Sequence, residues 1–152
     1  MTVKEWLQRI GKIERQIYSL EDSASRAFES ATNTGSRIVL SGQGGFSGKR
    51  ISRVEESLVI KISLEQAISE KLEELRQLRR AVMTVLSQVD DIDKRDILEM
   101  HYVTGWTLVY IADEVMKCTV RWVQIQHGNA LQDVAGILRG LPEITEHYQI
   151  DL

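Results

Sequence analysis

The sequence predicts an all-α protein in two parts, a long antiparallel coiled-coil hairpin followed by a unit of three shorter helices. Three observations lead to this prediction. The only Pro in 152 residues is Pro142, so nothing before it breaks a helix by removing a backbone donor. Half of the ten Gly lie between Gly35 and Gly48, which places one long break there. Elsewhere the apolar residues recur every three or four positions, as in an α-helix.

Residues 3–31 form the first predicted helix because their apolar positions are spaced alternately by four and three residues. This seam consists of Trp6, Ile10, Ile13, Ile17, Leu20, Ala24, Ala27 and Ala31. Polar and charged residues lie between these positions, as in the heptad repeat of a coiled coil. Thr2 can cap the helix, with Glu5 three residues later as the reciprocal partner of a capping box. A single apolar stripe is not stable in water, so a second helix must cover it.

The Gly- and Ser-rich segment 32–48 is predicted to be a flexible connection at the tip of the hairpin. Part of it imitates a phosphate-binding loop, but Gln43 and Arg50 stand where such a loop needs Gly and then Ser or Thr. Ser47 likewise stands where a dinucleotide-binding fingerprint needs Gly or Ala. A linker is therefore the stronger interpretation. We expect proteases to cut this segment first, and folding not to require it.

A second helix is predicted for residues 49–89, with an apolar stripe that faces the first helix. The stripe consists of Ile51, Val54, Leu58, Ile62, Ile68, Leu72, Leu75, Leu78, Val82, Leu86 and Val89. The two helices should pack antiparallel, and apolar residues outside the stripe, notably Val59 and Leu64, favour self-association into a four-helix dimer. The residues expected to mediate self-association are Trp6, Ile10, Ile13, Ile17, Leu20, Leu58, Leu72 and Leu75.

From residue 90 onward the pattern changes to three short helices. They are expected to span about 93–103, 107–116 and 119–138, beginning at the candidate N-cap residues Asp93, Thr107 and Thr119. Gly140 and Pro142 end the last helix, and residues 143–152 receive no assignment. The predicted domains are therefore a hairpin over residues 1–89, a three-helix domain over 90–140 and a tail over 141–152.

Composition and cysteine content restrict the class of protein. Hydrophobic residues make up 43% and charged residues 27% of the chain, which is the balance of a soluble globular protein. Cys118 is the only cysteine, so an intramolecular disulfide is excluded and a reducing compartment is favoured. No apolar run is long enough for a membrane helix, and the first residues lack the apolar core of a signal peptide. We therefore expect a cytoplasmic protein without membrane contact.

No constellation of residues indicates an enzyme or a metal site. The soft metal-ligand candidates are His101, His127, His147 and Cys118, and no pair of them has the spacing that presents two ligands together. Nothing in the sequence places a His and an orienting carboxylate beside Cys118. Packing in a turn between helices is therefore a better interpretation of Cys118 than a nucleophilic role. We expect no catalytic residue, no metal and no cofactor.

Residues 96–131 have the apolar pattern of a helix-turn-helix unit. The expected core residues are Ile111, Ala112, Val123, Ala130 and Leu131. A small residue such as Ala112 lets two helices cross closely, and the short turn between them sets their angle. A generic three-helix packing unit would show the same spacing, so spacing alone favours neither interpretation.

A resemblance to a known family favours the helix-turn-helix. Residues 102–131 of this chain resemble region 4 of sigma factors. The resemblance rests on three successive segments, Tyr-Val-Thr-Gly-Trp-Thr, Tyr-Ile-Ala-Asp-Glu-Val and Thr-Val-Arg-Trp-Val-Gln-Ile-Gln-His-Gly-Asn-Ala-Leu. The similarity is closer still to sigma-region-4-like proteins of the ArpU type and their relatives in phages and prophages of Gram-positive bacteria. Those relatives combine a helical segment, a Gly- and Ser-rich break, a Leu- and Ile-rich helix and an Arg-Trp-Val element followed by His-Gly-x-Ala-Leu. The chain resembles this layout over nearly the full length of its sequence.

The resemblance implies a transcriptional regulator whose third short helix enters the major groove of promoter DNA. The residues it implies in DNA binding are Thr119, Val120, Arg121, Gln124 and Ile125, with a phosphate contact at Asn129. The partners expected for such a regulator are double-stranded DNA and RNA polymerase, together with the second copy of the chain that the heptad seam predicts.

The distribution of charge favours an alternative function. Residues 1–89 hold fourteen Lys and Arg against eleven Asp and Glu, a net charge of +3, whereas residues 90–152 hold five against eleven, a net charge of −6. Arg121 is the only Lys or Arg between Cys118 and Leu138, and Gln126 stands where the family has a buried aliphatic residue. Phosphate neutralisation dominates DNA affinity. The alternative is therefore a protein-interaction module that binds RNA polymerase or another protein with little or no DNA contact.

Overall fold

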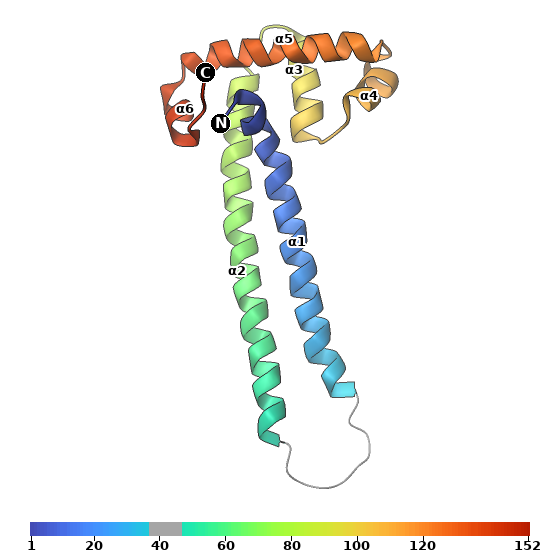
Figure 1. The fold of residues 1–152 in the computed structure, drawn as a ribbon, viewed down its shortest axis with the longest axis vertical. Helices are drawn as coiled ribbons and strands as arrows, with labels where there is room; N and C mark the ends of the chain where they lie inside the picture. The colour runs from blue at the N-terminus through green and yellow to red at the C-terminus, as the bar shows by residue number, and fades with distance from the viewer. Residues whose placement is uncertain (37–46) are drawn as a thin grey trace. The chain divides into compact units, whose positions relative to one another are not determined.

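The computed structural model describes residues 1–36 and 47–152, and all regular secondary structure in these residues is helical (Figure 1). The predicted all-α class is therefore confirmed. The elements are α1 Val3–Ser36, α2 Ser47–Leu86, α3 Ile92–Leu98, η1 Glu99–Val103, α4 Leu108–Tyr110, η2 Ile111–Met116, α5 Val120–Arg139 and α6 Pro142–Tyr148. The π-helical segments η1 and η2 directly continue α3 and α4.

The two long helices extend into the segment predicted to be a linker. Residues 32–36 belong to α1, and residues 47 and 48 belong to α2. The rest of the predicted linker, residues 37–46, lies outside the described residues. The expected flexibility and protease sensitivity of that segment therefore stay predictions.

The chain divides into two compact units. The first consists of residues 1–13 and 75–152, and the second of residues 14–74. Each long helix thus contributes to both units. The predicted boundary between residues 89 and 90 lies inside the first unit, because the last turns of α2 belong to the same compact body as the short helices.

The first unit has an apolar core to which both ends of the chain contribute. Its largest fully buried side chains include Trp6, Leu7, Ile10, Leu78, Val82, Leu86, Ile97, Leu98, Ile111 and Leu138. The predicted capping box at the start of α1 is confirmed. The Thr2 amide donates to Glu5 Oε2 at 2.7 Å, and the Glu5 amide donates to Thr2 Oγ1 at 3.3 Å. These bonds satisfy two backbone donors at the start of the helix.

The C-terminal tail, which received no assignment from the sequence, contains α6 and packs against the N-terminus. Pro142 opens α6, a position where its missing N–H is not needed. The ring centroids of Tyr148 and Trp6 lie 5.9 Å apart. The ammonium group of Met1 donates to Asp151 Oδ2 at 2.9 Å. These contacts join the two chain ends within the first unit.

In the second unit, α1 and α2 run in opposite directions (Figure 1). The ammonium group of Lys61 on α2 lies 4.7 Å from the centroid of the Phe28 ring on α1. Half-buried side chains of α2 include Ser57, Lys61, Leu64, Ile68 and Lys71, which have the spacing of a heptad repeat. The predicted stripe is wrong at Leu58 and Ile62, whose side chains are 49% and 58% exposed.

Candidate nucleic-acid interface

Residues 91–139 form three helices joined by two short turns. Asp91 caps the first of them, because its Oδ1 accepts hydrogen bonds from the amides of Asp93 at 3.0 Å and Lys94 at 3.2 Å. The prediction of Asp93 as the cap is therefore wrong, and Asp93 lies in the first turn of α3 instead. After η1 the chain turns at Gly105, whose φ of 86° glycine adopts without strain.

The other two predicted caps in this region are confirmed. Thr107 Oγ1 accepts a hydrogen bond from the Tyr110 amide at 3.1 Å, and Thr119 Oγ1 accepts one from the Trp122 amide at 3.2 Å. Between η2 and α5, Lys117 adopts the left-handed conformation with φ of 51°. This residue reverses the chain within a short turn and so sets the direction in which α5 leaves.

The three helices share an apolar core that orients α5. Its fully buried members are Ile97, Ile111, Ala112 and Val123, and the partly buried side chains packed against them are Met100, Leu108, Met116, Cys118, Val120 and Trp122. The predicted packing role of Cys118 is thereby confirmed, and Trp122 packs against the same core. Farther along α5, Ala130 is buried as predicted, whereas Leu131 is only half-buried.

The outer face of α5 presents most of the residues that the family resemblance implies in DNA binding. Arg121, Gln124 and Asn129 are exposed, and the side chain of Ile125 is 51% exposed. Arg121 and Gln124 are three residues apart, so they lie on one side of the helix. Asn129 follows Trp122 by seven residues, about two helical turns, so it lies on the side of α5 where Trp122 lies. The structure therefore brings Arg121 and Gln124 together and places Asn129 apart from Gln124.

Two residues of the implied DNA-binding set have other roles. Val120 is half-buried and packs against the core, so its prediction as an outward base-contacting residue is wrong. The physical reason is the helical period, which points Val120 to the same side as the buried Val123 three residues later. Thr119 uses its hydroxyl oxygen to cap α5, although its hydroxyl proton can still donate to a further partner.

A buried histidine holds α5 against η1. His127 Nε2 and the hydroxyl oxygen of Tyr102 lie 2.9 Å apart and share a hydrogen bond. The ring of His101 packs edge-on against His127, with 5.4 Å between centroids. Burial lowers the pKa of His127 to about 4, and the nearby His101 also lowers it. Burial raises the pKa of Tyr102 to about 12. Both side chains are therefore neutral near pH 7. The packing role of His127 was not predicted from the sequence.

Positive charge near the start of α5 is limited. Lys117, whose side chain is 69% exposed, lies 3.7 Å from a carboxylate oxygen of Glu114. Lys94 bonds to Asp133 at 2.8 Å and so links α3 to α5. Within the part of the chain that the structure describes, Arg121 forms no ion pair, so its guanidinium group is available to an external partner.

The residues predicted to mediate self-association are mostly buried within the single chain. Trp6, Ile10, Ile13, Ile17 and Leu75 are at most 7% exposed, Leu20 and Leu72 are half-buried, and Leu58 is 49% exposed. The first five side chains therefore stabilise the monomer and are not accessible to a second copy. Among the described side chains, the exposed apolar residues of α2 include Leu58, Val59, Ile60 and Ile62, which lie close together in the sequence.

Comparisons of this chain with protein-family models, curated proteins and solved structures find no match. Among the described residues, no helix is both long enough and apolar enough to cross a membrane.

Proposed function

We propose that this protein is a transcriptional regulator of a phage or prophage, acting in the cytoplasm of the bacterial host, and that α5 binds promoter DNA. The position of Arg121 and Gln124 is the main support for the proposal. Both side chains are exposed near the start of a 20-residue helix, and the core side of that helix is fixed by Val123 and His127. The resemblance of residues 102–131 to region 4 of sigma factors supports the same assignment.

The two exposed side chains have the chemistry needed to distinguish bases in the major groove. The guanidinium group of Arg121 can donate two hydrogen bonds to O6 and N7 of guanine, and the amide of Gln124 can form a bidentate pair with N6 and N7 of adenine. Lys117, in the turn before α5, carries an exposed ammonium group suited to a nearby phosphate. In this proposal, Arg121 and Gln124 provide specificity and Lys117 provides affinity.

The proposal includes a second copy of the chain, because one α5 offers few positive charges. A symmetric dimer doubles the base and phosphate contacts, and dimeric helix-turn-helix proteins bind two half-sites in this way. Leu58, Val59 and Ile62 share one side of α2, since Ile62 follows them by four and three residues. They are 49–63% exposed, and such a group of apolar side chains is typical of a protein contact. In this proposal the long helices serve self-association or contact with RNA polymerase.

Salt dependence of binding to short random-sequence duplexes tests whether α5 contacts DNA. Each phosphate contact adds roughly −0.9 to the slope of log affinity against log salt, so a dimer with about four contacts should lose affinity about a hundredfold between 50 and 200 mM salt. Lys117→Ala should reduce the slope, whereas Arg139→Ala, at the far end of α5, should leave it unchanged. Absence of binding at low salt, or binding that salt does not weaken, would contradict the proposal.

A further inference from the structure

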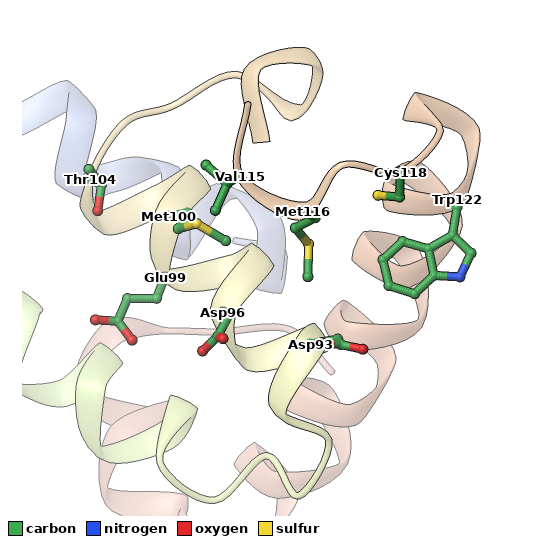
Figure 2. A pocket seen from close by; sticks show the side chains of 9 residues that line it. All are labelled: Asp93, Asp96, Glu99, Met100, Thr104, Val115, Met116, Cys118 and Trp122. Atoms are coloured by element: carbon green, nitrogen blue, oxygen red, sulfur yellow. The ribbon is translucent and has the colours of Figure 1, made fainter. Parts of the chain in front are cut away.

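The three-helix unit contains a groove of about 620 Å³ that lies between α3, η1, η2 and the start of α5 (Figure 2). Three carboxylates line one side of it, namely Asp93, Asp96 and Glu99. They recur every third residue along α3 and η1, which keeps their side chains near one another. From the sequence, Asp93 was predicted only as a helix cap, and Asp96 and Glu99 were not predicted as site residues.

The three carboxylates are not neutralised within the described chain. None of them forms an ion pair among the described residues, and the neighbouring Lys94 bonds to Asp133 instead. Like charges gathered on one concave surface repel each other and create a negative potential, which the low-dielectric protein wall strengthens. A cationic partner would relieve that repulsion.

The opposite side of the groove is apolar and polarisable. Met116, Cys118 and Trp122 lie across from the carboxylates, and Met100 lies between the two sides (Figure 2). Thioether side chains adapt to partners of irregular shape, and the face of an indole ring attracts both apolar groups and cations. This side of the groove favours a ligand that carries large apolar groups in addition to positive charge.

DNA is a poor occupant for this groove. Its phosphates would meet three carboxylates, and the groove points away from the proposed base-contacting residues. Since successive residues of an α-helix are about 100° apart, Trp122 points about 100° away from Arg121 and about 160° away from Gln124. The groove and the proposed DNA-contacting face can therefore be occupied at the same time.

We propose that the groove binds a short segment of a partner protein in which Lys or Arg residues flank a large aliphatic residue. The basic side chains would pair with Asp96 and Glu99, and the aliphatic side chain would insert between Met116 and Trp122. Apolar anchors combined with complementary charge are a recurring mode of peptide recognition. This proposal goes beyond DNA binding and does not require it.

Binding of the full-length protein to an array of random synthetic peptides tests the proposal. The array should select peptides that combine Lys or Arg with Leu, Ile or Met. The best of them should protect Cys118, the only cysteine of the chain, from alkylation by N-ethylmaleimide. The double variant Asp96→Asn with Glu99→Gln should bind that peptide about three- to tenfold more weakly at low salt. Asp113→Asn, which changes an exposed carboxylate on η2 outside the groove, should bind like the wild type.

Several results would overturn the proposal. One is selection by the array of peptides without basic residues, or of no peptides at all. Unchanged affinity of a double variant whose helix content is intact would overturn it, as would Cys118 that stays reactive in the complex. Spermine that protects Cys118 as effectively as the peptide does would also overturn the proposal, since the groove would then be a site for free polycations. Because no DNA is present, a failure of the proposed DNA binding would not alter these results.

Discussion

His127 shows how one side chain fixes the position of α5. It lies four residues after Val123 and three before Ala130, so the helical period places it on the core side of the helix. Its hydrogen bond with Tyr102 satisfies the Nε2 atom at 2.9 Å, and burial keeps the ring neutral. Protonation would place a charge in the core beside His101, which is costly without a compensating partner.

We predict that His127 makes the stability of the protein depend on pH. The pKa of His127 is about 4 in the folded chain against an ordinary value of 6.5, so between these two values the unfolded chain binds a proton that the folded chain does not. The free energy of unfolding should therefore be highest above about pH 6.5 and should fall as the pH is lowered toward 4. Urea denaturation at a series of pH values measures this slope.

The variant His127→Gln should have a smaller slope over the same pH range, because its neutral amide can still bond to Tyr102 but does not titrate. His147→Gln, which replaces an exposed histidine on α6, is the matched control and should keep the wild-type slope. Equal slopes in all three proteins would show that His127 does not titrate as the structure requires.

Residue-level predictions from the sequence succeeded where the cause was local. The packing of Val123 and Ala130 follows from helical spacing alone. Val120 was assigned by resemblance to an outward position, but the same spacing points it toward the core. The packing role of His127 was detectable in the same way, from its apolar neighbours at three and four residues. The groove, by contrast, depends on how η2 and α5 cross α3, which no local pattern contains.

At the scale of elements, the helix caps explain where most of the helices begin. Thr107 and Thr119 were predictable because each precedes an apolar helical pattern and carries a short side chain that accepts a hydrogen bond from a nearby amide. Asp91 and Asp93 fit that pattern almost equally well. The structure shows Asp91 in the extended conformation of a cap, with ψ of 115°.

We predict that Asp91→Ala lowers the free energy of unfolding by about 1 kcal/mol, the usual cost of removing an N-cap side chain. The variant loses two hydrogen bonds, to the amides of Asp93 and Lys94. Asp90→Ala removes the same charge one residue earlier and should change stability little, because Asp90 is exposed. Thermal or urea denaturation of both variants makes the comparison, and equal destabilisation would contradict the assignment of the cap.

The sequence could not determine which side of α2 faces α1 in the second unit. Residues 58, 59, 60 and 62 are apolar on nearly every side of the helix, so periodicity gives no single face there. The observed heptad continues in step with Leu75, Leu78 and Val82, which are buried farther along the same helix. This register brings Ser57 and Lys61 to the partly buried side and leaves Leu58 exposed.

At the scale of the whole molecule, the contact between the two chain ends was not predictable. The helix α6 has seven residues, too few to be stable alone in water. Its stability depends on tertiary contacts, among them Tyr148 with Trp6 and Asp151 with Met1. These pairs are about as distant in sequence as the chain allows, so no local pattern indicates them.

We predict that the protein self-associates through the exposed apolar residues of α2. Light scattering should give the mass of a dimer for the wild type at tens of micromolar. The double variant Val59→Ser with Ile62→Ser should be monomeric with unchanged helix content, since both side chains are more than half exposed. Tyr18→Ser, which changes an exposed residue of α1, should stay dimeric. A monomeric wild type would contradict this prediction.

Ile13→Asp distinguishes this interface from the one predicted by the heptad seam. Ile13 is 2% exposed, so an unpaired carboxylate there should unfold the first unit and not merely separate two copies. Circular dichroism should therefore show a loss of helix in this variant. A folded monomer would indicate that the seam, and not the exposed residues of α2, joins the copies.

The measurement that most directly tests DNA binding by α5 is selection of sites from a pool of random duplexes by wild type, Gln124→Ala and Arg121→Ala. Melting temperatures are measured in parallel, and both variants should melt like the wild type because the two side chains are exposed. The wild type should select a defined site. Each variant should lose about 1–3 kcal/mol on that site and relax the preference at one base position, an adenine for Gln124 and a guanine for Arg121. Selection of the same site with the same affinity by all three folded proteins would contradict the proposal that this face of α5 contacts bases.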